Sequence, residues 1–193
     1  MTWRRILAGL AAVAALTLTA GCGAGSSSGG PSAADPTSGS PSSTPSASSS
    51  PGGPYASYTP AAGPRIALST FTAHAPSGWR LDHTFGSHVV FADKGAGDIE
   101  FSELTYPPTG LAAMARIARD GGTWTRKPAI RKPVTIDGTR FYHLAGPVGG
   151  GHYVEEFGAV RHLRRVKLSF DLPGSPTAAT KLVGSVLATV HLR

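Results

Sequence analysis

Apolar and polar residues alternate along much of residues 65–193, and a period of two is typical of half-buried β-strands. The clearest alternation lies in residues 163–172. One face of this run is apolar and expected in the core, with Val166, Leu168 and Phe170. The other face is expected to be solvated or covered by polar contacts, with Lys167, Ser169 and Asp171. Similar runs predict further strands at residues 71–75, from 79 onward, and at 89–92, 99–106, 132–136, 139–144 and 153–160.

Turn residues separate these predicted strands. Asp137-Gly138, between two apolar runs, is the strongest short hairpin signal in the chain. Residues 93–97 and the glycine-rich residues 147–151 predict longer loops, because glycine tolerates a positive φ. In residues 99–104 the alternation divides the side chains between two faces, Ile99, Phe101 and Glu103 on one and Glu100, Ser102 and Leu104 on the other.

Two segments have helical periodicity instead. Residues 109–120 carry an apolar stripe that is expected to lie on the sheet, with Thr109 as the N-cap and Gly121-Gly122 ending the helix. The stripe consists of Leu111, Met114, Ala115 and Ala118. A second helix is predicted from Pro176, capped by Ser175. Its core-facing stripe consists of Leu182, Val183, Val186, Leu187 and Val190.

The order of these elements predicts an α+β fold for residues 65–193, a length that suits one domain with one core. The pattern resembles the Mog1/PsbP-like fold, an antiparallel β-sheet with helices packed against it. Three stretches carry the resemblance: residues 71–79 (FTAHAPSGW), 134–138 (VTIDG) and 181–186 (KLVGSV). The resemblance implies a module that binds proteins, cell-envelope components or small ligands and is seldom catalytic. It carries over no binding residue, because the family shares no site motif.

The beginning of the chain has the pattern of an export signal. Arg4 and Arg5 precede an apolar stretch over residues 6–20, which is shorter than the roughly 20 residues that span a bilayer. Ala20 and Gly21 lie directly before Cys22, and this arrangement resembles the lipobox of bacterial lipoproteins. The lipobox usually has Leu three residues before the cysteine, where this chain has Thr. Residues 1–21 are therefore predicted to be a lipoprotein signal peptide.

Cys22 is the only cysteine, so an exported chain cannot use it in an internal disulfide. Lipidation explains its presence, with diacylglycerol on the thiol and further acyl chains such as palmitate. Two or more acyl chains give stable anchoring, which predicts a protein at the outer face of the cell membrane. The alternatives are a secretory signal cleaved elsewhere and an uncleaved anchor.

Residues 23–64 consist almost wholly of Gly, Ser, Pro, Thr and Ala, with Asp35 as the only charged residue. Such a segment cannot bury enough apolar area to offset its ordering entropy, so residues 22–64 are predicted to be the lipidated cysteine and a disordered linker. A flexible coil of this length spans roughly 35 Å. The Ser, Thr and Pro content suits either O-glycosylation or an unmodified spacer. Tyr55 and Tyr58 are its only aromatic residues and mark a predicted contact with the domain.

Basic residues exceed acidic ones, giving a formal charge of +7, or +5 without Arg4 and Arg5. A candidate basic patch consists of Arg126, Lys127, Arg131, Lys132, Arg161, Arg164, Arg165 and Lys167. Such a patch would meet anionic lipid headgroups or acidic wall polymers. The alternative is a solvated strand face whose charges do not converge. Nucleic acid is not expected as a partner of an exported, anchored domain.

Seven histidines raise the question of a metal site: His74, His83, His88, His143, His152, His162 and His191. The sequence has no His-Glu-x-x-His motif and no second cysteine for structural zinc. The weak candidate is His143 with His152, facing each other across the loop at 147–151 and joined by Glu155 or Glu156. Ordinary surface histidines are the alternative, and no cofactor is predicted.

The sequence contains no signature of nucleophilic catalysis. No serine lies in Ser-x-x-Lys, the Gly-x-Ser-x-Gly match at residues 25–29 falls in the Ser- and Gly-rich stretch after Cys22, where no geometry is expected to be held for a base, and strand alternation sends Glu155 and Glu156 to opposite faces. We therefore expect a non-enzymatic lipoprotein whose domain binds an envelope protein or ligand. The alternatives are an envelope enzyme with an unrecognised site, assisted by a metal at His143 and His152, and a structural spacer.

Overall fold

The computed structural model describes residues 54–105 and 109–193. The predicted signal peptide, Cys22 and the predicted linker up to residue 53 lie outside the described residues. The strands are β1 (Arg65–Ala67), β2 (Phe71–His74), β3 (Arg80–Phe85), β4 (Val89–Lys94), β5 (Gly97–Thr105), β6 (Ala129–Ile136), β7 (Thr139–Gly149), β8 (His152–Arg161), β9 (Arg164–Pro173) and β10 (His191–Leu192). The helices are α1 (Leu111–Gly121) and α2 (Pro176–Leu187). Neither helix is long and apolar enough to cross a bilayer.

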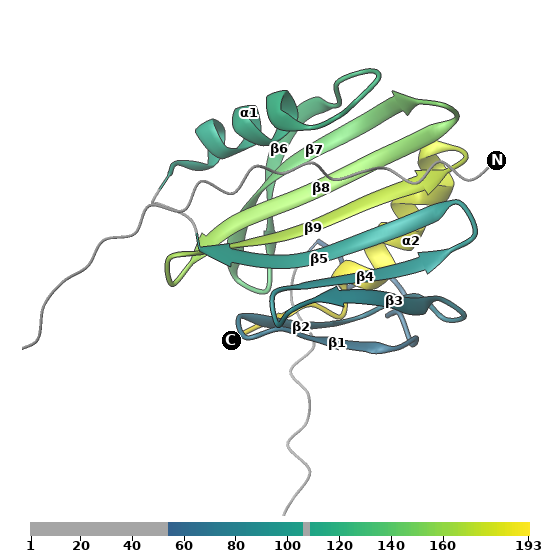
Figure 1. Ribbon diagram of the computed structural model, residues 1–193, viewed down its shortest axis with the longest axis horizontal. Coiled ribbons are helices and arrows are strands. Elements are labelled where there is room, and N and C mark those ends of the chain that lie inside the picture. Colours follow the sequence, from purple (N-terminus) through teal and green to yellow (C-terminus); the bar gives the residue numbers. More distant parts are fainter. Residues whose placement is uncertain (1–53, 106–108) are drawn as a thin grey trace, which may run out of the picture. The chain divides into compact units, whose positions relative to one another are not determined.

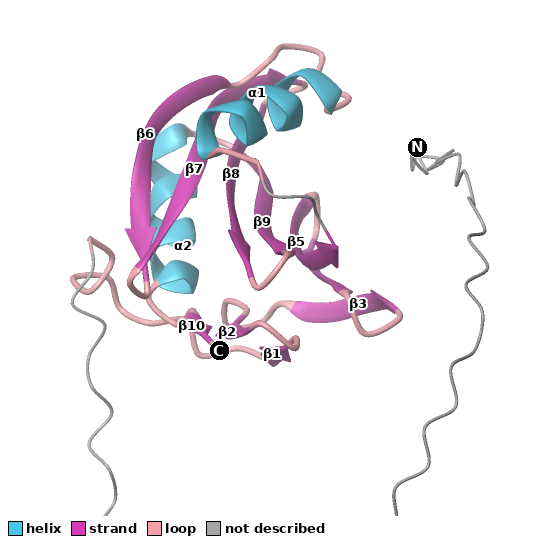
Figure 2. Ribbon diagram, turned by 90° about the vertical axis from the view of Figure 1, so that its left-hand side faces the viewer, coloured by secondary structure: helices cyan, strands magenta, loops and turns pink. Residues whose placement is uncertain are grey.

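The domain is built on an antiparallel sheet of seven strands in the order β3-β4-β5-β9-β8-β7-β6 (Figure 1). The sheet curves, with α2 against one face and α1 on the opposite face (Figure 2). A smaller antiparallel sheet, β1-β2-β10, joins the first strands of the domain to its C-terminal residues. The short strands β1 and β10 were not predicted, because two or three residues carry too little alternation to be recognised.

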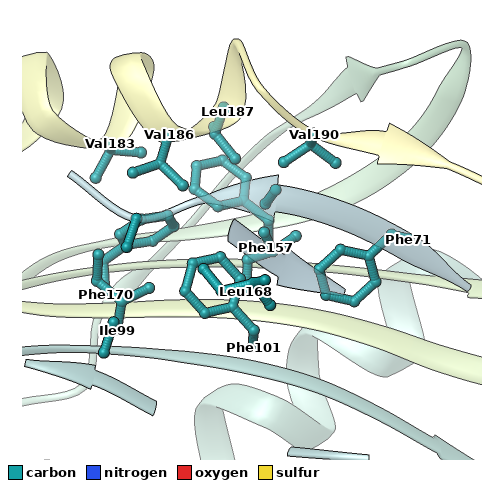
Figure 3. Close-up of a cluster of buried hydrophobic side chains, with 14 of the residues drawn as sticks. Phe71, Ile99, Phe101, Phe157, Leu168, Phe170, Val183, Val186, Leu187 and Val190 are labelled. Atoms are coloured by element: carbon teal, nitrogen blue, oxygen red, sulfur yellow. The ribbon is translucent and has the colours of Figure 1, made fainter. Parts of the chain in front are cut away.

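The main core lies between α2 and the seven-stranded sheet (Figure 3). Its members are the apolar faces that the alternation predicts, and the side chains of β5, β8 and β9 meet those of α2 there. Val166, Leu168 and Phe170 on β9 are all fully buried, which confirms the clearest strand of the sequence pattern. Val183 and Val186 of α2 are buried against them, so the predicted helical stripe also faces the core.

A second core lies on the other face of the sheet, under α1. Met114 and Ala115 pack there against Tyr142 and Leu144 of β7, as the predicted stripe requires. The beginning of the helix differs from the prediction. Gly110 rather than Thr109 is the N-cap, and no side chain caps the helix. Gly110 has an extended backbone and its carbonyl accepts the first helical hydrogen bonds, so the helix begins one residue later than Thr109 would allow.

The hairpin turns follow the chemistry of their residues. The turn at Asp137-Gly138 has φ values of 44° and 74°, so the predicted two-residue hairpin is confirmed. The loop predicted at 147–151 is shorter than expected, because β7 continues to Gly149 through a register shift that accommodates Pro147. The turn between β8 and β9 places Leu163 at φ 61°, so the last strand begins one residue later than predicted.

Residues 54–63, here called the docking segment, contact the domain. The Ala61 amide donates to the Ser185 carbonyl at 2.9 Å, and the Gly63 amide donates to the Ala75 carbonyl at 2.8 Å. The Tyr55 ring packs edge-on against Phe157 with centroids 6.4 Å apart. The predicted tyrosine contact is therefore present, and residues 54–63, at the end of the predicted linker, are held by contacts with α2, β8 and the residue that follows β2.

Candidate ligand-binding site

A bulge in the edge strand β6 lies at the border of the site. Arg131 pairs with His143 of β7, and the register then shifts so that Val134 pairs with Phe141. Lys132 and Pro133 lie opposite the single residue Tyr142, so β6 has one extra residue at this bulge. Proline lacks a backbone N–H and is tolerated in sheets mainly at edges and bulges. The bulge brings both Arg131 and Lys132 to the border of one cavity.

A histidine and a carboxylate lie beside them, on the face of the sheet that α2 covers. His143 stacks on Phe157, with ring centroids 4.5 Å apart and planes at 16°. Its Nε2 atom lies 3.1 Å from Oε2 of Glu155. The Thr180 hydroxyl of α2 donates to the other oxygen, Oε1, at 3.1 Å. Glu155 is only 6% exposed, so three elements hold a buried carboxylate in a fixed position.

Two tyrosines form walls of the same cavity. Burial raises the pKa of the Tyr55 phenol, and the nearby Glu155 carboxylate and Tyr58 raise it further. Burial and Glu155 also raise the pKa of Tyr153, and Arg131 opposes this by its charge and its hydrogen bond. Both phenols therefore remain neutral hydrogen-bonding groups at physiological pH.

These residues enclose a cleft of about 310 Å³, here called the Tyr55 cleft. It is lined by Tyr55, Arg131, Lys132, His143, Ala145, Tyr153, Glu155, Thr180 and Val183. Its volume lies at the lower end of the range for pockets that bind small molecules. Its surfaces combine aromatic and aliphatic side chains with a few convergent polar groups, the composition expected of a ligand site.

The sequence located only part of this cleft. The sequence predicts that Tyr55 contacts the domain and offers His143 with Glu155 as a weak metal candidate. It does not assign Tyr153, Ala145, Thr180 or Val183 to a site. The cleft residues come from the docking segment, β6, β7, β8 and α2, and no spacing in the sequence relates these elements. A proline and two cations in an exposed strand were the one local signal of a bulge at its border.

The candidate basic patch is divided by the fold. Arg126 and Lys127 follow α1, and the Arg126 amide donates to Val148 at the end of β7. Arg161 and Arg164 flank the turn at the opposite end of β8. Arg131 and Lys132 are the members that border the Tyr55 cleft. The eight residues therefore do not form one patch, in agreement with the alternative of charges that do not converge.

Several of these cations are also paired with acids. Lys127 Nζ lies 2.9 Å from Asp120, and Lys167 Nζ lies 2.6 Å from Glu100. Arg164 lies 3.7 Å from the buried Glu103. Arg165 shares the polar face of β9 with Lys167, away from α2. Within the described ranges, no ion pair joins Arg131 or Lys132 to a carboxylate.

The fold separates the two histidines of the metal hypothesis. His143 faces α2, whereas His152 points to the opposite face and its Nδ1 atom lies 2.6 Å from Asp171. Along β8, His152 is five residues from the register partner of His143, a distance of roughly 16 Å. Among the residues the structure describes, no three His, Cys, Asp or Glu side chains are grouped for a metal ion. Strand register, rather than proximity in sequence, determines which face of the sheet each histidine occupies.

Glu155 and Glu156 lie on opposite faces, as the alternation predicts. Glu155 faces the Tyr55 cleft, whereas Glu156 accepts a hydrogen bond of 2.7 Å from the Tyr142 hydroxyl on the α1 face. Each carboxylate thus has its own partners. They cannot act together as an acid and a base.

A second cavity of about 460 Å³ borders Glu103 near the turn between β1 and β2. Glu103 is fully buried and accepts hydrogen bonds from Ser69 Oγ at 2.6 Å and from the Thr70 amide at 2.8 Å. Burial alone would raise its pKa, but these hydrogen bonds lower the pKa to about 2. The carboxylate therefore serves to hold this turn against β5.

Comparison with known proteins bears on the fold alone. No protein-family model and no curated protein matches the sequence. The solution structure of cyanobacterial PsbP (CyanoP) from Synechocystis sp. PCC 6803 is similar, with a TM-score of 0.50, 12% identity, and coverage of 67% of this chain and 92% of that chain. A crystal structure from Bacteroides thetaiotaomicron VPI-5482 has a TM-score of 0.46 and 17% identity, and covers 68% of this chain. The match spans about half of that second chain, 48%.

The similarity to cyanobacterial PsbP confirms the predicted fold class. The domain has a PsbP-like α+β fold, an antiparallel sheet with helices packed against it. At this level of identity the similarity says nothing about a ligand or a partner.

Proposed function

We propose that this chain is an exported lipoprotein whose PsbP-like domain binds an envelope ligand or partner in the Tyr55 cleft and is not an enzyme. Lipid on Cys22 would hold it at the outer face of the cell membrane. The anchor rests on the sequence, in which an apolar stretch and two small residues precede a single cysteine. Binding rests on one observation, the pairing of the half-buried His143 with the buried Glu155 inside a cleft of about 310 Å³.

The polar groups of the cleft are held in place by hydrogen bonds and by ring stacking. Glu155 accepts from His143 and Thr180, and His143 is fixed by its stack on Phe157. Groups that are oriented before a ligand arrives lose little entropy when it binds. The arrangement therefore supports specific recognition rather than general adhesion.

The position of Tyr55 relates the cleft to the linker. Tyr55 lies in the docking segment, close to the end of residues 22–64, which are predicted to be the tether. A tether with a span of roughly 35 Å would keep the cleft close to the membrane while leaving the domain free to reorient. A ligand or partner within the cell envelope is the expected occupant.

The alternative, an envelope enzyme assisted by a metal, is less well supported. It required His143 and His152 in one site, and His152 instead contacts Asp171 on the other face of the sheet. The His143–Glu155 pair alone supplies an oriented polar group, which binding uses as readily as catalysis does. We therefore favour a binding function.

Filling the cleft tests this proposal. Thr180 is exposed on α2 and borders the cleft, so Thr180→Trp would place an indole in its opening with little effect on the core. Ala178→Trp is the matched control, since Ala178 is exposed on the same helix and lies outside the cleft lining. The measurement is cross-linking in intact membranes followed by mass spectrometry of the captured molecules.

We expect Thr180→Trp to lose a specific occupant that the unmodified chain and Ala178→Trp both retain. Equal capture by all three proteins would contradict binding in this cleft. Circular dichroism melting of each variant establishes that loss of capture does not reflect unfolding.

A further inference from the structure

We infer that the Tyr55 cleft binds a small organic anion, with its carboxylate or phosphate group at Arg131 and Lys132 and an apolar or aromatic body between Tyr55 and Tyr153. This inference rests on the proposed function and names the chemical class of its ligand. It is carried by the charges, the hydrogen bonds and the lining of the cleft.

The border of the cleft is positively charged. The bulge in β6 places two successive cations, Arg131 and Lys132, at the same cavity. Other cations of the predicted patch lie beside carboxylates, as Lys127 does with Asp120 and Lys167 with Glu100. Arg131 and Lys132 form no ion pair with a described residue, so at a concave surface they attract an anion, and the arginine can bind an oxyanion through two parallel hydrogen bonds.

Glu155 is the one carboxylate among the described residues that line the cleft. Glu155 is 6% exposed, and both of its oxygens already lie within hydrogen-bond distance of a partner, Oε2 of His143 and Oε1 of Thr180. A ligand ammonium group would have to compete with these partners. Two cations against one carboxylate also leave the lining with a net positive charge, which favours an anionic over a cationic ligand.

The remaining surface of the cleft is aromatic and aliphatic. Tyr55 and Tyr153 present aromatic rings, and Ala145 and Val183 present aliphatic groups. Such a lining gains free energy by covering an apolar or aromatic body, while the phenol hydroxyls can hydrogen-bond at its edges. The volume of about 310 Å³ is that of roughly ten water molecules, which suits a compact ligand of one or two rings.

A series of three indoles tests the sign of the preferred charge. Indole-3-acetate, indole-3-acetamide and tryptamine have nearly the same shape and carry charges of about −1, 0 and +1 near neutral pH. Isothermal titration calorimetry with the full-length protein in detergent gives their affinities. Indoxyl phosphate in place of indole-3-acetate then distinguishes phosphate from carboxylate as the preferred oxyanion.

We expect indole-3-acetate or indoxyl phosphate to bind about tenfold or more tightly than the neutral amide, with tryptamine weakest. The Arg131→Ala variant should lose most of this preference and bind the acid and the amide about equally. Arg80→Ala is the matched control, because Arg80 is exposed on β3 at the opposite edge of the sheet. It should retain the preference.

Equal affinity for the acid and the amide, tighter binding of tryptamine, or an unchanged preference in Arg131→Ala would overturn the inference. Failure of all the indoles to bind would overturn it as well. The proposed function has a separate readout. If Thr180→Trp still removes the natural occupant, the cleft binds a ligand of another class and only this inference fails.

Discussion

At the scale of single residues, Glu103 is a charged side chain that is buried beside apolar side chains. The alternation along β5 places it on the same face as Ile99 and Phe101, and all three are fully buried. Ser69 and Thr70 supply the hydrogen bonds that make this tolerable, including one of 2.7 Å from Thr70 Oγ1. They lie more than thirty residues earlier in the chain, so local sequence gives no sign of the arrangement.

The lowered pKa of Glu103 makes its contribution to stability dependent on pH. The pKa is about 2 in the folded protein against an ordinary value of 4.5, so the carboxylate stabilises the fold above pH 4.5. This contribution is lost as the pH falls through 4.5 towards 2. We expect Glu103→Gln to reduce the free energy of unfolding by about 1–3 kcal/mol at pH 7, because a buried hydrogen-bonded charge is replaced by an amide.

Urea denaturation at pH 7 and at pH 3 measures this effect. The difference between the unmodified protein and Glu103→Gln should narrow at the lower pH. Glu100→Gln is the control on the opposite face of β5, where its partner is Lys167 and the expected cost is below about 1 kcal/mol. A pH-independent difference, or none at pH 7, would show that the Glu103 charge does not stabilise the fold.

At the scale of elements, the contact between the docking segment and α2 depends on a glycine. A Cβ atom at Gly184 would lie 2.4 Å from Cδ1 of the Tyr58 ring, far closer than carbon atoms pack. Glycine within a helix normally costs about 1 kcal/mol relative to alanine. Here it leaves room for Tyr58, so the helix gives up intrinsic stability in order to bind the segment that also forms a wall of the Tyr55 cleft.

The close approach of Tyr58 to Gly184 predicts that the effect of Gly184→Ala on stability changes when Tyr58 is removed. In the unmodified protein, Gly184→Ala should lower the free energy of unfolding by about 1–3 kcal/mol through overpacking. In a Tyr58→Ala background, the same change should be neutral or raise it by up to about 1 kcal/mol. Thermal and urea unfolding of the four proteins form a double-mutant cycle. Additive effects of the two substitutions would exclude close packing of Tyr58 on Gly184.

The bulge in β6 is the other element that determines the site. A regular strand would alternate Arg131 and Lys132 between the two faces of the sheet, whereas the register shift brings both to the Tyr55 cleft. The bulge also disrupts the hydrogen-bonding edge of β6, and with its two cations it discourages pairing with another strand. One irregularity thus shapes the border of the cleft and also protects the edge of the sheet.

At the scale of the whole molecule, the proposed location at the membrane depends on Cys22, a residue outside the domain. We expect Cys22→Ser to remove the thiol that accepts the lipid, so that the protein is released or its precursor stays unprocessed. Each buried methylene contributes about 0.8 kcal/mol to membrane binding, so loss of the acyl chains should transfer essentially all of a processed protein to the soluble fraction.

Membrane fractionation and the intact mass of the mature N-terminus provide the measurement. Thr19→Leu is the control, because it restores the usual lipobox residue three positions before Cys22 and should leave processing at least as efficient. Normal acylation of the Cys22→Ser chain, or a first residue other than Cys22 in the unmodified protein, would contradict the lipoprotein assignment.

The sequence by itself determined the secondary structure and the faces of the main elements. Val166, Leu168 and Phe170 are buried, Asp137-Gly138 forms a hairpin turn, and Ser175 caps α2, accepting from the Ala178 amide at 3.4 Å. These outcomes depend on side-chain alternation, backbone conformational preference and local capping, which act within a few residues of the chain. The α+β class and the PsbP-like arrangement follow from the order of such elements.

Only the tertiary structure decided which residues share a site. His143 and His152 are close in sequence, yet strand register sends them to opposite faces and gives them different acidic partners. Tyr55 and Thr180 are far apart in sequence, yet both border one cleft. Register, bulges and the docking of a segment on a helix depend on long-range packing, in which each contact is set by the whole core rather than by neighbouring residues.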